Sequence, residues 1–171
     1  LLLPRGFPAR WLGLAGLLPL LTAAPAPLRE GELRMTVLDV GHGLAVAVRT
    51  RGHTLLYDTG PALGPGADSG DRIVVPYLRA TGVRRLDALV ISHDDADHTG
   101  GAASLLEALP VQTLLTSLPD LDPLVVGTAN ALRCYAGQAW EWDGVRFEML
   151  HPPRASYDEP AWKDNDRSCV L

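Results

Sequence analysis

The part of the sequence richest in chemistry is the stretch at residues 92–101, which holds two histidines and three aspartates. It follows an apolar run typical of a buried strand and precedes a segment with the pattern of a helix. Charged side chains at the end of a buried strand are costly unless a partner compensates them. Imidazole nitrogens and carboxylate oxygens bind zinc, manganese and iron, so the stretch predicts a metal site.

The spacing of these residues indicates how they are shared between metal ions. On an extended backbone alternate residues point the same way, so His93, Asp95 and Asp97 are expected to share one face. Asp97 and His98 are adjacent and face different points, which suits a site for two metal ions. The Gly-Gly pair at 100–101 permits a sharp turn into the next helix. The alternative is a solvated acidic loop, but the density of ligand types at a strand end favours the metal site.

The surrounding sequence predicts alternating strands and helices. An Asp-Gly pair at 143–144 predicts the turn of a hairpin, and the glycine- and proline-rich residues 60–70 predict a loop without regular structure. Residues 118–136 predict a loop and a helix. The expected helices are 101–109 and a segment near 71–82, which Asp71 is expected to cap and Pro76 to confine to the part after that residue. The expected strands are 33–40, 44–49, 54–58, 86–92, 111–116, 138–142 and 145–150.

The first 28 residues differ from the rest. Residues 11–21 are apolar without a charge, Pro19 interrupts them, and Arg5 and Arg10 precede them. A signal-peptide core, the last span of a multi-pass protein and a buried helix all remain open, and the hydropathy and flanking charges favour membrane or export. We expect residues 1–28 to be the end of a transmembrane region with its linker, and residues 33–171 to be one domain cut at its end.

Composition excludes several classes of protein. The chain has 171 residues, 47% of them hydrophobic, and a formal net charge of -5, which excludes intrinsic disorder and makes a strongly basic nucleic-acid module unlikely. With two cysteines it is no disulfide-stapled mini-protein, and Cys134 and Cys169 are expected to be unpaired. The other residues that could serve a functional site are expected to be structural. His151 is expected to pack in a loop, His53 to be a solvated turn residue, and Trp140 and Trp142 to lie in the core or at a sheet edge.

The motif His-x-Asp-x-Asp-His at residues 93–98, followed by Gly-Gly, resembles the metal-binding motif of the metallo-β-lactamase fold. The commoner form of that motif has His at the position of Asp95. An ordered set of further motifs resembles the C-terminal domain of the ComEC family, a bacterial inner-membrane DNA-uptake channel. That set comprises residues 37–43, 55–61, 75–78, 86–93, 150–153 and 165–171. His42 departs from the glutamine usual in the family, and we do not take it as a ligand.

The resemblance implies an α/β fold, the αββα sandwich, incomplete at its C-terminus and preceded by a membrane-segment remnant. His93 and Asp95 match the ligands of a first metal ion, and Asp97 and His98 match those of a second. Asp97 also matches the catalytic residue that holds the attacking water, and Asp58 matches a carboxylate that orients the metal-binding loop. The implied cofactors are two divalent ions, manganese or zinc, and an aspartate at position 95 favours manganese.

The implied function is phosphodiester cleavage of the DNA strand that is not transported, by water that two metal ions activate. The implied partners are single-stranded DNA, the membrane and other competence proteins. The implied location is the inner membrane, with the domain facing the periplasm or outside.

Two rival functions stay open. One is another hydrolase of this fold, acting on a lactam, a thioester or a small phosphoester. The other is a non-catalytic module associated with the channel.

The superfamily completes its site with later Gly-Asp and His motifs that this sequence does not contain before Leu171. We therefore expect the 171-residue chain alone to bind metal weakly and to hydrolyse inefficiently, and tight binding of two metal ions in a titration would contradict this.

Overall fold

The computed structural model describes residues 16–17 and 26–171. The expected membrane remnant therefore lies mostly outside the described residues. Among those that are described, no helix combines the length and the apolar character needed to cross a membrane. From residue 34 onward strands and helices alternate, as expected.

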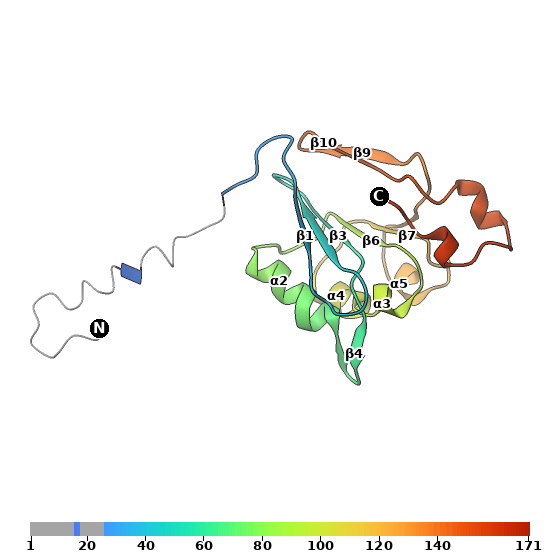
Figure 1. Ribbon diagram of the computed structural model, residues 1–171, viewed down its shortest axis with the longest axis horizontal. Coiled ribbons are helices and arrows are strands. Elements are labelled where there is room, and N and C mark those ends of the chain that lie inside the picture. The colour runs from blue at the N-terminus through green and yellow to red at the C-terminus, as the bar shows by residue number, and fades with distance from the viewer. Residues whose placement is uncertain (1–15, 18–25) are drawn as a thin grey trace, which may run out of the picture.

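A mixed six-stranded sheet forms the centre of the molecule (Figure 1). Its first three strands are the expected antiparallel meander. The chain then passes through helices and returns to the sheet parallel to the third strand, and two further parallel strands follow. In spatial order the strands are β1 (Arg34–Val37), β2 (Val46–Arg49), β3 (Thr54–Tyr57), β6 (Ala88–Ile91), β7 (Leu114–Thr116) and β8 (Ala131–Arg133).

Helices pack against one face of this sheet. Leu78 and Leu105 from two of them are fully buried with Leu56, Leu89 and Leu114 of the sheet. Burial of each such side chain contributes roughly 1.5–3 kcal/mol, so this layer fixes the strands from one side. The helices are α2 (Val75–Ala80), entered through a π-helical turn at Gly70–Val74, then α3 (Ala96–Thr99), α4 (Ala102–Ala108) and α5 (Pro123–Val126).

The predicted hairpin packs against the opposite face (Figure 1). It consists of β9 (Ala139–Trp142) and β10 (Val145–Glu148) and turns at 143–144. Phe147 and Met149 are buried against Leu55 and Val90 of the sheet. Helices, central sheet and second sheet are thus three layers of the expected sandwich.

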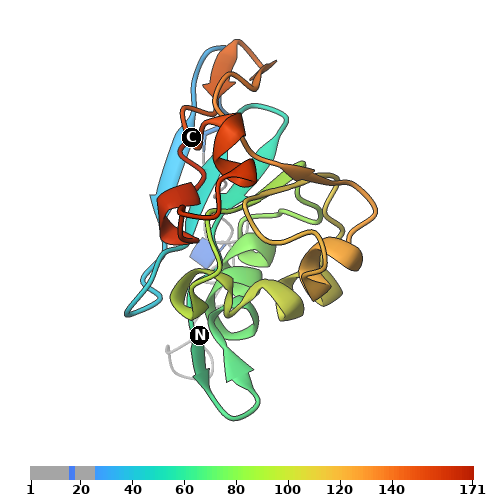
Figure 2. The same cartoon turned by 90° about the vertical axis from the view of Figure 1, so that its right-hand side faces the viewer.

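Three local predictions are wrong. Residues 60–70 are not a plain loop but contain a small hairpin, β4 (Ala62–Gly64) and β5 (Ala67–Asp68), which extends away from the sheet opposite β9–β10 (Figure 2). Residues 118–136 contain the expected helix, α5, but also a strand, β8, that was not predicted. Asp71 caps no helix, and Pro76 does not delay α2, because it lies in the first turn, where a missing N–H leaves no bond unmade.

The prediction for the cysteines is also wrong. Cys134 and Cys169 form a disulfide across a sequence separation of 35 residues, with their Cα atoms 5.9 Å apart. Both residues are fully buried in the cluster between the two sheets. The pairing depends on two distant segments meeting at the end of β6, which no local pattern in the sequence reveals.

Asp143, at the tip of the β9–β10 hairpin, ties the second sheet to the first. Its carboxylate accepts hydrogen bonds from Thr50 Oγ1 (2.6 Å), the Gly52 backbone N–H (2.7 Å) and His53 Nδ1 (3.0 Å). The bonds from Thr50, His53 and Gly52 hold the pKa of the Asp143 carboxyl well below its usual range. His53 also stacks on Trp142, with ring centroids 4.9 Å apart, so it is a packing residue and not merely solvated.

This arrangement predicts a pH-dependent contribution to stability. An aspartate whose pKa is lower in the folded than in the unfolded state stabilises the fold at pH values above its ordinary pKa, here 3.8. This stabilisation is lost progressively as the pH falls below that value. The Asp143→Asn variant is therefore expected to unfold at a lower urea concentration than the wild type at pH 7. The difference should narrow at pH 3. Asp71→Asn, at a carboxylate that is 62% exposed, is the matched control, and equal midpoints for Asp143→Asn and wild type at pH 7 would contradict the prediction.

Candidate metal centre

The 92–101 stretch begins directly after β6, at the edge formed by the carboxyl ends of the parallel strands. Asp58 follows the neighbouring strand β3 and so reaches the same edge. Loops that follow adjacent parallel strands meet there, which is where ligands collect in open α/β sheets. The structure therefore brings Asp58 beside His98, although 40 residues separate them.

Asp58 is fully buried at the centre of this site. One carboxylate oxygen accepts the Ser92 backbone N–H at 2.7 Å, and the other accepts Ser92 Oγ and His98 Nδ1, each at 2.7 Å. Burial raises the pKa of the Asp58 carboxyl, and the hydrogen bonds from His98 and Ser92 oppose that rise. A buried carboxylate that holds an imidazole in this way has the geometry that the expected orienting role requires.

The same hydrogen bonds assign the protons of both imidazoles. Ser92 donates its hydroxyl proton to Asp58, so its oxygen accepts from His93 Nδ1, 2.9 Å away. His98 donates its own Nδ1 proton to Asp58. In its neutral form each ring therefore has its lone pair on Nε2, the form that binds a metal ion. Ser92 was not among the predicted site residues. Its position, as a small polar residue between a buried strand and the first histidine, is the sequence feature that could have indicated its role.

Each of these lone pairs faces a carboxylate. His93 Nε2 lies 3.2 Å from Asp95 Oδ2, and His98 Nε2 lies 3.8 Å from Asp97 Oδ2. Two acceptors that face each other need a cation or a proton between them, so the donor set fits divalent metal ions. The division of these residues into His93 with Asp95 and Asp97 with His98, for two metal positions, remains a prediction.

The pairs do not merge into a larger cluster. In the part of the chain that the structure describes, no group of three or more His, Cys, Asp or Glu side chains is gathered in a way that could hold a metal ion. Protein zinc sites use three or four protein ligands. Each pair supplies two donors, fewer than such a zinc site uses.

The motif is not extended throughout, contrary to expectation: Asp95 has an extended backbone (φ -82°, ψ 140°), but the chain is helical from Ala96 onward. Pairing of β6 with its neighbours ends at Ile91, and without a partner strand the following residues form α3 instead. Asp95 is the residue before this short helix, and Asp97 and His98 lie within it. Adjacent helical residues point about 100° apart, so Asp97 and His98 still face different points.

The Gly-Gly pair after the motif serves close packing and not a sharp turn. The φ of Gly100 is -58° and that of Gly101 is -95°, values open to any residue. A Cβ at Gly101, however, would lie 2.4 Å from the Gly70 nitrogen. The pair thus lets the loop lie against the start of the helical layer.

Gly43, in the turn between β1 and β2, makes a similar close approach to Asp97. Its φ is +125°, and a Cβ there would lie 2.1 Å from the Asp97 carbonyl oxygen. The next residue, Leu44, donates its N–H to that oxygen at 3.3 Å. The β1–β2 turn thereby holds the backbone of a candidate ligand.

Gly43→Ala is expected to displace Asp97 and to lower Mn²⁺ affinity about 10-fold, as loss of a ligand's support typically does. Calorimetric titration of the full-length protein measures this. Gly41→Ala is a matched control, because Gly41 also has a positive φ (+77°) but no atom lies within 4 Å of the added Cβ. Equal affinities for the two variants would show that the contact with Asp97 is unimportant.

Of the other histidines, His42 contacts the Asp97 carboxylate more closely than His98 Nε2 does, and His151 contacts neither pair. The His42 side chain is 95% exposed, and its Nε2 lies 3.4 Å from Asp97 Oδ2. His151 Nε2 contacts the Asp166 carbonyl oxygen at 2.8 Å, and its ring lies beside Trp162, which confirms a loop-packing role.

A cavity of about 690 Å³ lies at the opposite edge of the sheet, between the β9–β10 hairpin and the segments that enter β6 and β7. Trp140 and Trp142 line it, and Trp140 stacks on Phe147 with centroids 5.5 Å apart, which confirms the predicted packing role. None of the candidate ligands lines this cavity. The candidate ligands lie instead at the carboxyl edge of the sheet.

Fold and site together define the class of protein. The model of the Metallo-beta-lactamase superfamily matches residues 38–154, and the chain belongs to this superfamily, whose members typically bind divalent metal ions. A crystal structure of the metallo-β-lactamase SMB-1 in a complex with mercaptoacetic acid has a TM-score of 0.53 and 16% identity. The match covers 75% of this chain and 53% of that chain. At this identity the likeness shows the fold alone.

Within the superfamily, comparison with curated proteins confirms the resemblance to the ComEC family. Competence protein ComA of Neisseria gonorrhoeae is 41% identical over 172 residues, which is 100% of this chain and 22% of the relative. Recombination protein 2 of Haemophilus influenzae is 36% identical over 144 residues, 84% of this chain and 17% of the relative. The chain thus spans about a fifth of the length of these relatives.

Proposed function

We propose that this chain is the metal-dependent hydrolase domain of a bacterial DNA-internalisation protein and cleaves phosphodiester bonds of the strand that is not transported. One observation carries the proposal: the pairs His93–Asp95 and Asp97–His98 lie on a chain that is similar along its whole length to a competence protein. Two divalent ions at these pairs, manganese or zinc, supply a Lewis acid and an activated water.

The residues of the chain prepare this chemistry. Asp58 and Ser92 fix both imidazoles with their Nε2 lone pairs free, so no reorientation is needed when metal binds. Asp97, next in the chain to His98, holds the attacking water through its carboxylate. Asp95 contributes a hard oxygen donor where the superfamily more often has a histidine nitrogen, which favours manganese.

The proposed location is the bacterial inner membrane, with the domain facing the periplasm and with single-stranded DNA and other competence proteins as partners. The Cys134–Cys169 disulfide supports this location, because disulfides persist in oxidising compartments such as the periplasm. Protease treatment of spheroplasts is expected to degrade the domain. Full protection would contradict a periplasmic orientation.

The activity is tested with the full-length protein, in Mn²⁺ or Zn²⁺, on end-labelled single- and double-stranded DNA, a chromogenic β-lactam and a thioester. We expect cleavage of DNA and no turnover of the other two substrates. Turnover of the lactam or the thioester without DNA cleavage would establish the rival hydrolase. Turnover of none of them, with transformation unaffected by Asp97→Ala, would establish a non-catalytic module.

A further inference from the structure

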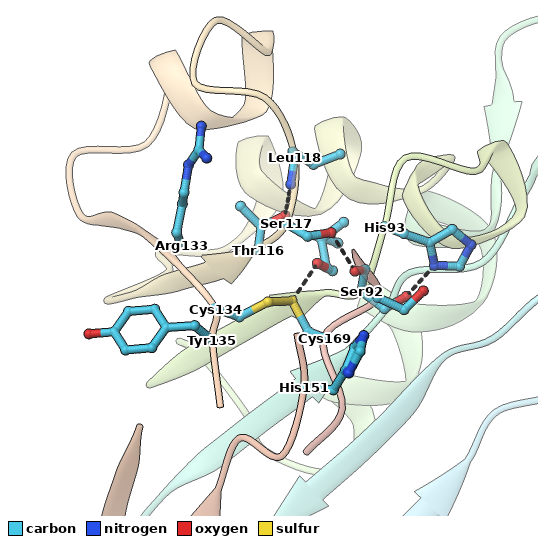
Figure 3. The surroundings of a disulfide bond; sticks show 12 residues. Ser92, His93, Thr116, Ser117, Leu118, Arg133, Cys134, Tyr135, His151 and Cys169 are labelled. Carbon is cyan, nitrogen blue, oxygen red and sulfur yellow. Dashed lines mark hydrogen bonds between the residues drawn. A yellow bond between two sulfur atoms is a disulfide. The ribbon is translucent and has the colours of Figure 1, made fainter. Parts of the chain in front are cut away.

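The Cys134–Cys169 disulfide lies next to the candidate metal centre, and Ser92 lies between it and the His93 ring (Figure 3). Cys134 directly follows β8 and continues its pairing with β7 by donating its N–H to the Thr116 carbonyl oxygen at 2.9 Å. Cys169 belongs to the segment 168–171, which is far from the motif in sequence. The cross-link thus joins the edge of the sheet to a segment that reaches the site.

The carbonyl oxygen of Ser92 is where that segment meets the site. It accepts the Cys169 backbone N–H at 2.9 Å and the Ser117 hydroxyl at 2.7 Å. Both donors come from outside the metal-binding loop. The Ser92 side chain, in turn, bonds Asp58 and His93, so the orientation of this one residue is transmitted to the first candidate ligand.

Cys169 is itself held on three sides. Its N–H bonds Ser92 at the end of β6, and its carbonyl oxygen accepts the Tyr57 hydroxyl from the end of β3. Its sulfur is bound to Cys134 beyond β8. The covalent bond is the strongest of these anchors. It fixes Cys169 to the end of β8, while the two hydrogen bonds hold it at the ends of β3 and β6, which carry Asp58 and Ser92.

We propose that Cys134 and Cys169 are positioning residues, whose disulfide fixes the Ser92 peptide and thereby aims His93 at its metal ion. Neither cysteine touches metal or substrate. Without the cross-link, segment 168–171 loses its covalent anchor, the bond to the Ser92 carbonyl opens more often, and the support of His93 weakens. The consequence for metal affinity rests on the proposed function, whereas the effect on Ser92 does not.

Hydrogen–deuterium exchange of the oxidised full-length protein and its Cys134→Ala/Cys169→Ala variant tests this proposal. We expect peptides covering 92–98 to exchange about 10-fold faster in the variant, while α2 exchanges as in the wild type. Mn²⁺ affinity, measured by electron paramagnetic resonance, should fall about 10-fold. Unchanged exchange at 92–98, or an equal increase in α2, would overturn the proposal.

Leu78→Ala separates positioning from a general loss of stability. Leu78 is fully buried in α2 and belongs to the core on the other face of the sheet. This variant should lower the thermal unfolding midpoint and increase exchange in α2, with Mn²⁺ affinity unchanged. If the double alanine variant does not fold, Cys134→Ala/Cys169→Val fills more of the buried space, lacks the cross-link and must give the same local result.

The two proposals can fail separately. If the wild type cleaves no DNA but removal of the disulfide increases exchange at 92–98, the proposed function fails and the positioning role stands. If the wild type cleaves DNA and the double variant matches it in exchange and in Mn²⁺ affinity, the positioning role fails.

Discussion

Replacement of Asp97 with alanine is expected to abolish metal-dependent DNA cleavage by the full-length protein, with kcat/KM falling on the order of 10³-fold or more. Two losses combine in this variant. The carboxylate facing His98 Nε2 is one of the two donors at its metal position, and it is also the group that we propose to hold the attacking water. A gel assay with end-labelled DNA in Mn²⁺ measures the rate.

Asp94→Ala is the matched control for this experiment. Asp94 lies in the same loop and has the same charge, but its side chain is exposed and is not part of either donor pair. This variant should retain the wild-type rate within a few-fold, because exposed charges contribute little. Equal losses in the two variants would show that the loop contributes general charge and not a specific ligand, and full activity of Asp97→Ala would remove Asp97 from the mechanism.

The part of the site that could be predicted rests on local signals. A buried apolar strand followed by densely spaced His and Asp predicts where the candidate ligands lie along the chain. Asp58 was expected there only from the family resemblance, and the pairing of β3 with β6 places it beside His98. The hairpin at 143–144 follows likewise from an Asp-Gly turn between alternating segments. In each case the interaction lies within a few residues or within one pair of adjacent strands.

The features that escaped prediction depend on contacts between distant segments. β8 has only three residues, and Leu132 in it is exposed, so its sequence shows no buried periodicity. The disulfide requires this strand and the segment 168–171 to meet at the end of β6. The second half of the motif is helical after strand pairing has stopped at Ile91, a limit set by the neighbouring strands and not by the motif itself.

The second large effect is expected from Asp58→Asn, which preserves the shape of the buried side chain but reverses a hydrogen bond. The new amide oxygen can still accept the Ser92 backbone N–H. The new NH₂ group then faces His98 Nδ1, which has to become an acceptor. The proton of His98 moves to Nε2 and removes the lone pair that binds metal, so affinity for Mn²⁺ or Zn²⁺ should fall about 10- to 100-fold.

Calorimetric metal titration measures this loss, and ¹⁵N chemical shifts of the imidazole nitrogens report the change of tautomer directly. Asp87→Asn is the matched control, because Asp87, directly before β6, is another buried carboxylate; it accepts the Thr54 N–H at 2.8 Å and pairs with Arg85 in place of a histidine. Both variants should lose stability, by about 1–3 kcal/mol, because each disturbs a buried hydrogen-bonded carboxylate. Since Asp58→Asn alone should change the His98 tautomer, an unchanged tautomer with weakened metal binding would assign Asp58 to folding and remove it from the orientation of His98.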